Sequence, residues 1–239
     1  MLDHHGKTSH VRWGILAFLS CLAVYLLRLD SVAGMFGDDA WYILLGKSLA
    51  TGQGYTLINS PSAGIMPEYP PAFPALLSLV FRLYPSFPAN VWLLKMPSII
   101  CLLLTGLLAY HYLVRVHQVG RRLALGISLA TMLTPGLVFL ATSTLMSEIV
   151  FMFLLTATLV VVERSLSVVN RRLAWLLLTL AAVIATLAFL TRSIALGLLI
   201  SVLIYYLIKK RFAFALIFPL LVCLLLGPWL YYKKQKILR

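Results

Sequence analysis

Seven long apolar segments separated by short polar stretches dominate the sequence. They run over residues 13–35, 91–114, 123–141, 147–163, 173–191, 193–208 and 212–232. A helix needs roughly 20 apolar residues to cross about 30 Å of hydrocarbon, so each segment is predicted to be one membrane span. The pattern predicts an all-α polytopic membrane protein with about seven transmembrane helices. Residues 13–239 then form a single membrane domain behind a polar tail at residues 1–12.

An eighth apolar stretch, "PPAFPALLSLVFRLYP" at residues 70–85, does not fit this pattern. Between its prolines it offers only about 12 helical residues, or roughly 18 Å at 1.5 Å per residue. That length is too short for a span, and Arg82 lies within it. We therefore expect an interfacial helix here, inside one long loop that covers residues 36–90.

A second interfacial helix is predicted earlier in the same loop. Between residues 39 and 50 the apolar side chains of Trp41, Leu44, Leu45 and Leu49 share one face of a helix. The sequence "TGQGY" at residues 51–55 then ends it with two glycines. Within the third span, Pro135-Gly136 is expected to produce a kink.

Composition and charge exclude a soluble domain. The chain is 62% hydrophobic and 11% charged, with a mean hydropathy of +0.97. A net charge of +13 would suggest nucleic-acid binding in a soluble protein, but here the cations lie in short clusters between apolar runs, so no nucleic-acid partner is expected.

The clusters set the expected topology through the positive-inside rule. A cytoplasmic N-terminus places eleven of the 20 basic residues inside: Lys7, Arg12, Arg115, Arg121, Arg122, Arg164, Arg171, Arg172, Lys209, Lys210 and Arg211. The C-terminal "YYKKQKILR" falls on the outer side, against the rule. We predict a multi-pass protein of the plasma (inner) membrane, with the 36–90 loop at the outer, periplasmic face.

Few side chains are candidates for chemistry, because the chain has only seven acids. Asp38 and Asp39 begin the outer loop, Glu68 precedes the 70–85 helix, and Glu148 and Arg192 lie at outer ends of later spans. A carboxylate at a span boundary is costly in hydrocarbon and is a functional candidate. Each also has a plain explanation: an Asp can cap a helix, Glu148 can be solvated, and Arg192 can snorkel.

Three stretches of the sequence resemble parts of one protein family. "GDDAWYILLGKSLATGQGY", "PEYPPAFPALLSLVFRLYP" and "TSTLMSEIVFMFLLTATL" are similar to the N-terminal part of the membrane-embedded GT-C glycosyltransferases, near the protein O-mannosyltransferases and aminoarabinose transferases. "LTRSIALGLLI" and "GPWLYYKKQ" agree more loosely. Members of this class continue with further helices after their seventh span.

The resemblance implies transfer of a sugar from a polyprenyl-phosphate carrier to a lipid, glycan or protein acceptor at the outer face. By position, Asp38 corresponds to the catalytic acid, beside Asp39, and Glu148 to the acid of the second outer loop. Tyr69 stands where the aminoarabinose transferases place a lysine for the lipid phosphate, which leaves Arg192, with Glu68 and Tyr69, as the phosphate-binding candidates. A divalent metal near Glu148 is a candidate cofactor.

On these residues we expect an inverting glycosyltransferase in which Asp38 is the general base. One alternative is a non-catalytic or truncated membrane module that binds a polyprenyl lipid or a partner protein. Another is a small-solute transporter, which would need polar groups deep inside its spans. The spans offer mainly hydroxyls there, which favours the first two interpretations.

Overall fold

The computed structural model describes residues 4–59 and 69–237, with side chains for 14–59 and 69–235. The regular secondary structure of these residues is entirely helical. The elements in order are α1 (His4–Arg28), α2 (Gly37–Ala50), α3 (Ala72–Leu83), α4 (Val91–Arg115), α5 (Arg121–Met132), α6 (Pro135–Thr142), α7 (Glu148–Ser167), α8 (Arg171–Thr191), the 3-10 turn η1 (Ser193–Ala195), α9 (Leu196–Ile208) and α10 (Phe212–Ile237).

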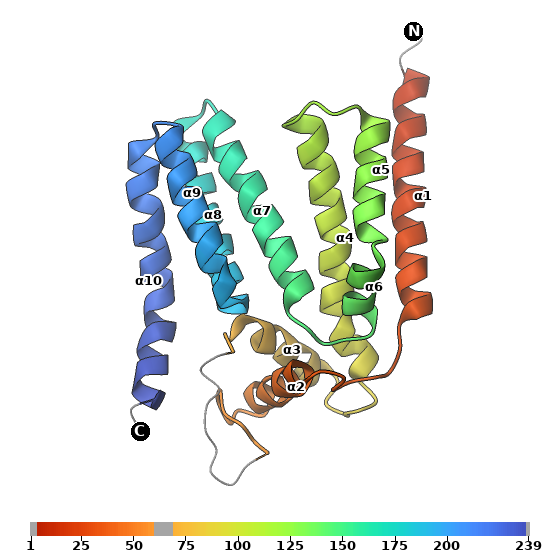
Figure 1. The fold of residues 1–239 in the computed structure, drawn as a ribbon, viewed down its shortest axis with the longest axis vertical. Coiled ribbons are helices and arrows are strands. Elements are labelled where there is room, and N and C mark those ends of the chain that lie inside the picture. Colours follow the sequence, from red (N-terminus) through yellow and green to blue (C-terminus); the bar gives the residue numbers. More distant parts are fainter. Residues whose placement is uncertain (1–3, 60–68, 238–239) are drawn as a thin grey trace.

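The helices form two groups that stand side by side (Figure 1). One contains α1, α4, α5 and α6, the other contains α7 to α10, and α2 and α3 lie across one end. Apolar side chains form a core in each group, and the first core also takes in α2, α3 and the start of α7. The short pair α2–α3 is therefore fixed against the bundle by buried surface rather than by chain connectivity alone.

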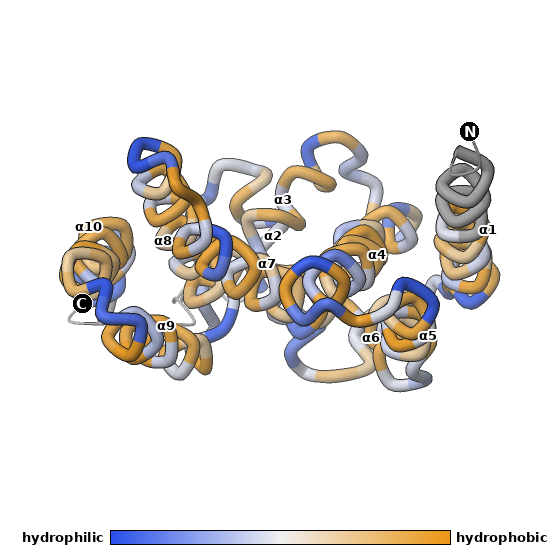
Figure 2. Tube along the Cα trace, turned by 90° about the horizontal axis from the view of Figure 1, so that it is seen from above, coloured by the Kyte–Doolittle hydropathy of each residue, from blue (hydrophilic) through white to orange (hydrophobic). Residues whose placement is uncertain are grey.

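The described residues contain four helices long and apolar enough to cross a membrane: α4, α7, α8 and α10 up to Gln235. The bent pair α5–α6 is a fifth candidate, and the described part of α1 and the segment Ser193–Ile208 are shorter apolar helices. Figure 2 shows apolar residues along the helices and hydrophilic residues mainly where helices end. This distribution is typical of a polytopic membrane protein.

The predicted kink of the third segment is present as a break. Helix α5 ends at Met132, α6 begins at Pro135, and the two axes differ by 54°. Proline has no N–H to donate to the preceding turn, and its ring clashes with that turn, so α5 cannot continue through it.

The first segment ends earlier than expected. Helix α1 stops at Arg28, so residues 29–35 are not helical, while residues 4–12, expected as a polar tail, are helical. The stop coincides with an ion pair to a buried lysine, since Lys95 Nζ lies 2.6 Å from Asp30 Oδ1 and donates at 2.9 Å to the Asp30 carbonyl. This anchor holds the chain after α1 against α4.

Both short helices predicted in the 36–90 loop form, and α3 keeps the expected 12 residues. The apolar face predicted for α2 is not the face that packs inward: of Trp41, Leu44, Leu45 and Leu49 only Leu45 is buried, and the other buried positions are Asp39, Tyr42, Ile43, Gly46 and Ser48. The reason is the packing of α3 on Gly46, where an added Cβ would lie 3.0 Å from Leu77 Cβ and 3.2 Å from the Pro74 carbonyl oxygen. Capping by an Asp is also wrong, since Phe36 is the N-cap and both acids lie in the first turn.

Candidate functional site

The beginning of α2, the beginning of α7 and the end of α8 meet at the end of the bundle that α2 and α3 cover (Figure 1). Tyr42, on α2, is hydrogen-bonded through its hydroxyl to Ser147 Oγ at 2.9 Å. Ser147 precedes α7 and accepts a hydrogen bond from Arg192 Nη1 at 3.2 Å. These contacts bring together segments that lie more than 40 residues apart in the sequence.

Asp38 enters this network through Tyr69. The Tyr69 hydroxyl donates to Asp38 Oδ1 at 2.6 Å, and the Tyr69 ring meets the Tyr42 ring edge-on at 5.3 Å. The Asp38 side chain is half-buried. Tyr69 is one of the predicted phosphate-binding residues, and in the structure its hydroxyl donates to the carboxylate of Asp38.

Arg192 and Glu148 form an ion pair, with Nη1 2.6 Å from Oε1. Their side chains are 32% and 31% exposed, so the pair lies at the boundary between core and surroundings. A guanidinium has five N–H donors, and within the described residues only Nη1 makes a contact. The Oε2 atom of Glu148 is buried without a hydrogen-bond partner in the described part of the chain.

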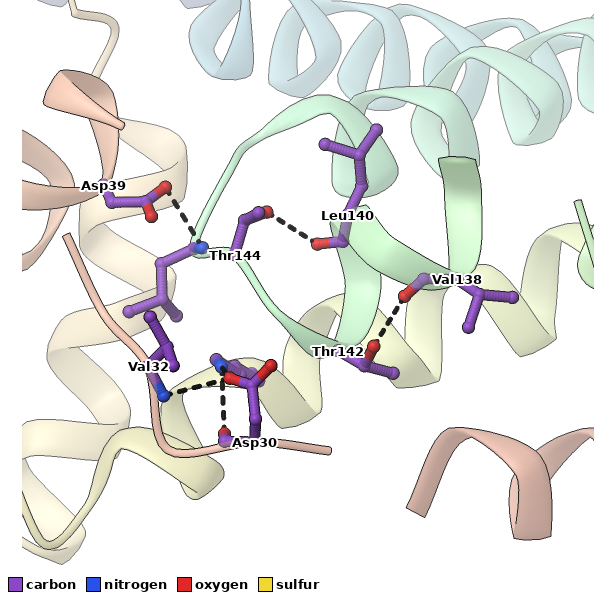
Figure 3. A network of polar contacts seen from close by, with 9 residues as sticks. Asp30, Val32, Asp39, Val138, Leu140, Thr142 and Thr144 are labelled. Carbon is purple, nitrogen blue, oxygen red and sulfur yellow. Dashed lines mark hydrogen bonds and ion pairs between the residues drawn. The ribbon is translucent and has the colours of Figure 1, made fainter. Parts of the chain in front are cut away.

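Asp39 points the other way from Asp38. It is 0% exposed, and its Oδ1 accepts a hydrogen bond from the Leu145 N–H at 3.2 Å (Figure 3). Burial raises the pKa of this carboxyl, and hydrogen bonding from main-chain N–H groups, Leu145 first, acts in the opposite direction. Asp39 therefore supports the loop that carries Ser147 and Glu148, and its burial fits a positioning role better than contact with a substrate.

Tyr42 and Ser147 are central to the site, although the sequence analysis did not propose them. Burial raises the pKa of the Tyr42 hydroxyl, so this group stays protonated. Asp38 and Glu148 raise this pKa further, while Ser147 and Arg192 lower it, because all four lie near the hydroxyl. The available signal was position: Tyr42 follows Asp38 by four residues, one helical turn, and Ser147 directly precedes Glu148.

Lys95 is a third residue that the sequence analysis did not propose. It is 0% exposed within α4, and it pairs with Asp30 just after α1. Asp30 also accepts from the Val32 N–H at 2.9 Å (Figure 3). Its main-chain N–H donates to the Thr142 carbonyl at the end of α6. A lone lysine inside an apolar segment was the signal, because an unpaired charge there is costly.

The remaining candidates are Glu68 and a metal. Glu68 lies outside the described residues. Among the residues that the structure describes, no three His, Cys, Asp or Glu side chains come together as metal ligands. Arg192, rather than a second acid, faces Glu148.

Comparison with protein-family models, with curated proteins and with solved structures finds no match to this chain. The site offers a half-buried carboxylate with a tyrosine donor, and an arginine whose other N–H groups have no partner among the residues that the structure describes. A carboxylate suits proton abstraction, and a guanidinium suits an anionic oxygen such as that of a phosphate.

Proposed function

We propose that the protein transfers a sugar from a polyprenyl-phosphate carrier to an acceptor at the membrane surface, with inversion at the anomeric carbon. The observation that carries this proposal is the grouping of Asp38, Glu148 and Arg192 around Tyr42 at one end of an apolar helical bundle. A lipid-linked phosphate needs both an apolar environment for its chain and a cation at the membrane boundary. The resemblance of three segments to GT-C glycosyltransferases points to the same chemistry.

In the proposed reaction Asp38 takes the proton from the acceptor's nucleophilic group as that group attacks the anomeric carbon. A new bond forms there, and the bond from the anomeric carbon to the phosphate oxygen breaks. The polyprenyl phosphate leaves with the electron pair. A phosphate is stable as an anion, so no general acid is required, and the unengaged N–H groups of Arg192 would stabilise its charge.

The other residues have supporting roles in this scheme. Glu148 orients the Arg192 guanidinium through Oε1. Tyr69 fixes the Asp38 carboxylate, and Tyr42 joins α2 to the start of α7. No step requires a metal.

We further propose that the chain crosses the membrane seven times. Besides α4, α7, α8 and α10, the bent pair α5–α6 forms one crossing, and α1 and η1–α9 form the other two. The arrangement of cations supports this topology: Arg115, Arg121, Arg164 and Arg171 lie at the helix ends opposite the candidate site. The positive-inside rule then makes that end cytoplasmic and puts the candidate site at the outer face.

A non-catalytic lipid-binding module is the second candidate. It is favoured by the fact that Asp38 and Glu148 already have partners, Tyr69 and Arg192. The test is incubation of membranes containing the protein with a panel of radiolabelled polyprenyl-phosphate sugars, beside membranes without it. Transfer of label supports the enzyme. Retention of the labelled lipid without transfer across the panel contradicts it and supports the binding module.

A further inference from the structure

A deep groove lies between α1, α4 and α5, at the end of the bundle opposite the candidate site. Its volume is about 980 Å³, which is large compared with the roughly 30 Å³ that one water occupies in the liquid. None of the candidate-site residues lines it. The groove is therefore a separate feature, and its interpretation does not depend on the proposed transferase activity.

The mouth of the groove is cationic. Arg115, at the end of α4, and Arg121, at the start of α5, both line it, and both side chains are exposed. Neither has a carboxylate within 4.0 Å in the ranges 14–59 and 69–235. Two unpaired guanidinium groups beside one cavity provide a binding place for an anion, and a phosphate matches their geometry.

Below the mouth the groove is apolar. Ile15 and Leu19 of α1 and Leu107 of α4 are large exposed hydrophobic side chains that line its sides. Helix α5 contributes Leu125 and Leu129. An inorganic anion would fill only the mouth and leave this surface uncovered, whereas acyl chains would cover it.

One polar group inside the groove, the Ser128 hydroxyl, has no hydrogen-bond partner among the described residues. Ser128, on the lining face of α5, is 3% exposed, and its Oγ makes no hydrogen bond within the described residues. It follows Arg121 by two helical turns, about 10 Å along the helix axis. A buried hydroxyl without a partner is unfavourable, so a ligand acceptor at this depth would stabilise the bound state.

We propose that this groove binds an anionic glycerophospholipid from the adjoining leaflet. Arg115 and Arg121 hold its phosphate, the acyl chains lie against the apolar walls, and the Ser128 hydroxyl donates to an ester carbonyl. A zwitterionic lipid would place its own cation near the two arginines, so an anionic headgroup is preferred. Basic pockets between transmembrane helices are known places for such headgroups.

The test uses the purified full chain in detergent, incubated with equal amounts of phosphatidylglycerol and phosphatidylcholine. Native mass spectrometry then counts the lipid of each kind that stays bound. Each arginine near the surface increases the affinity for an anionic lipid by a factor of roughly five. We therefore expect a preference for phosphatidylglycerol over phosphatidylcholine of about tenfold or more. The double variant Arg115→Gln/Arg121→Gln should bring the ratio close to one.

The matched control is Arg122→Gln/Arg172→Gln, which removes the same charge from exposed positions at the same end, outside the groove. It should keep the preference. An equal preference for both lipids in the wild type would overturn the proposal, as would the same loss of preference in the control.

A second variant tests the apolar part and leaves the cations in place. Ile15→Trp fills the groove from α1 and should reduce bound phosphatidylglycerol several-fold, while unchanged binding would contradict the proposed path of the acyl chains. Millimolar inorganic phosphate distinguishes a lipid site from a soluble-anion site. We expect it to leave phosphatidylglycerol bound, and complete displacement would overturn the lipid assignment.

Discussion

The Nη1 atom of Arg192, just after α8, lies 2.6 Å from Oε1 of Glu148, the first residue of α7. The two helices are joined in sequence at their other ends, so this ion pair closes the open end of the α7–α8 hairpin. It also holds the guanidinium beside Ser147 and Tyr42. The ion pair therefore links the packing of α7 against α8 to the geometry of the candidate site.

Arg192→Gln tests the phosphate-binding role. The variant keeps a polar side chain but removes the charge, and we expect binding of polyprenyl phosphate to weaken roughly 10- to 100-fold, because hydrogen bonds to charged groups contribute about 1.5–3 kcal/mol. Equilibrium binding of a fluorescent polyprenyl phosphate measures this. Arg164→Gln, at the opposite end of α7, is the control and should bind as the wild type does. Equal affinity of Arg192→Gln and wild type would remove Arg192 from the site.

The Asp30–Lys95 pair predicts an asymmetry between two substitutions. Lys95 is 0% exposed and the Asp30 side chain is 37% exposed, so only the lysine is cut off from water when its partner is lost. Asp30→Asn should lower the free energy of unfolding by about 3 kcal/mol, and Lys95→Met by about 1 kcal/mol.

Unfolding in detergent, followed by circular dichroism, measures both variants and the double variant. The double variant should be more stable than Asp30→Asn, because it removes the unpaired buried charge. Equal effects of the two single substitutions would contradict this description of the pair.

The same pair predicts a pH dependence. Desolvation raises the pKa of Asp30, but hydrogen bonds from Lys95, Ser143 and the Val32 N–H outweigh it and lower the pKa below its ordinary value. A carboxyl with a lowered pKa in the folded state stabilises the fold above its unfolded pKa of about 4. This stabilisation is lost as the pH falls through the lower, folded-state pKa.

The stability difference between wild type and Asp30→Asn/Lys95→Met should therefore be constant above about pH 5 and should shrink below about pH 4. Thermal midpoints measured between pH 3 and pH 7 give this difference. A stability difference that grows as the pH falls would contradict the lowered pKa of Asp30.

The close packing of α3 on Gly46 predicts that a larger side chain at this position destabilises the protein. A larger side chain there meets Leu77 and the Pro74 carbonyl, so Gly46→Leu should push α2 away from α3 and destabilise the protein by about 1–3 kcal/mol. Gly126→Leu is the matched control, because nothing lies within 4 Å of a Cβ at that helical position. The thermal midpoint of each variant measures the effect. Equal midpoints for the two leucine variants would argue against close α2–α3 packing.

The course of the helices could be predicted from the sequence because hydrocarbon length and composition act locally. The 70–85 stretch, for example, forms a short helix that ends near its flanking prolines. The early end of α1 could not be predicted in this way, since it coincides with Asp30 bonding to a lysine 65 residues away. The buried face of α2 was missed for a similar reason, because α3 packs on its glycine side.

In the candidate site, too, some features could be predicted from the sequence and others could not. Asp38, Glu148 and Arg192 could be proposed because charges are scarce in an apolar chain. The hydrogen bond between Tyr42 and Ser147, 105 residues apart, depends on how α2 lies against α7. The different surroundings of Asp38 and Asp39 also needed the structure, because adjacent residues on a helix lie about 100° apart and only packing decides which one is buried.

The central claim is that Asp38 accepts the proton when sugar is transferred from polyprenyl phosphate. Its most direct test is the initial rate of sugar transfer by reconstituted protein carrying Asp38→Asn. The matched control is Glu163→Gln, the same chemical change near the other end of α7. We expect the rate to fall by a factor of about 10² to 10⁴ in Asp38→Asn and to stay near that of the wild type in the control, with equal amounts of inserted protein. Near-normal transfer by the Asp38→Asn protein would contradict the account.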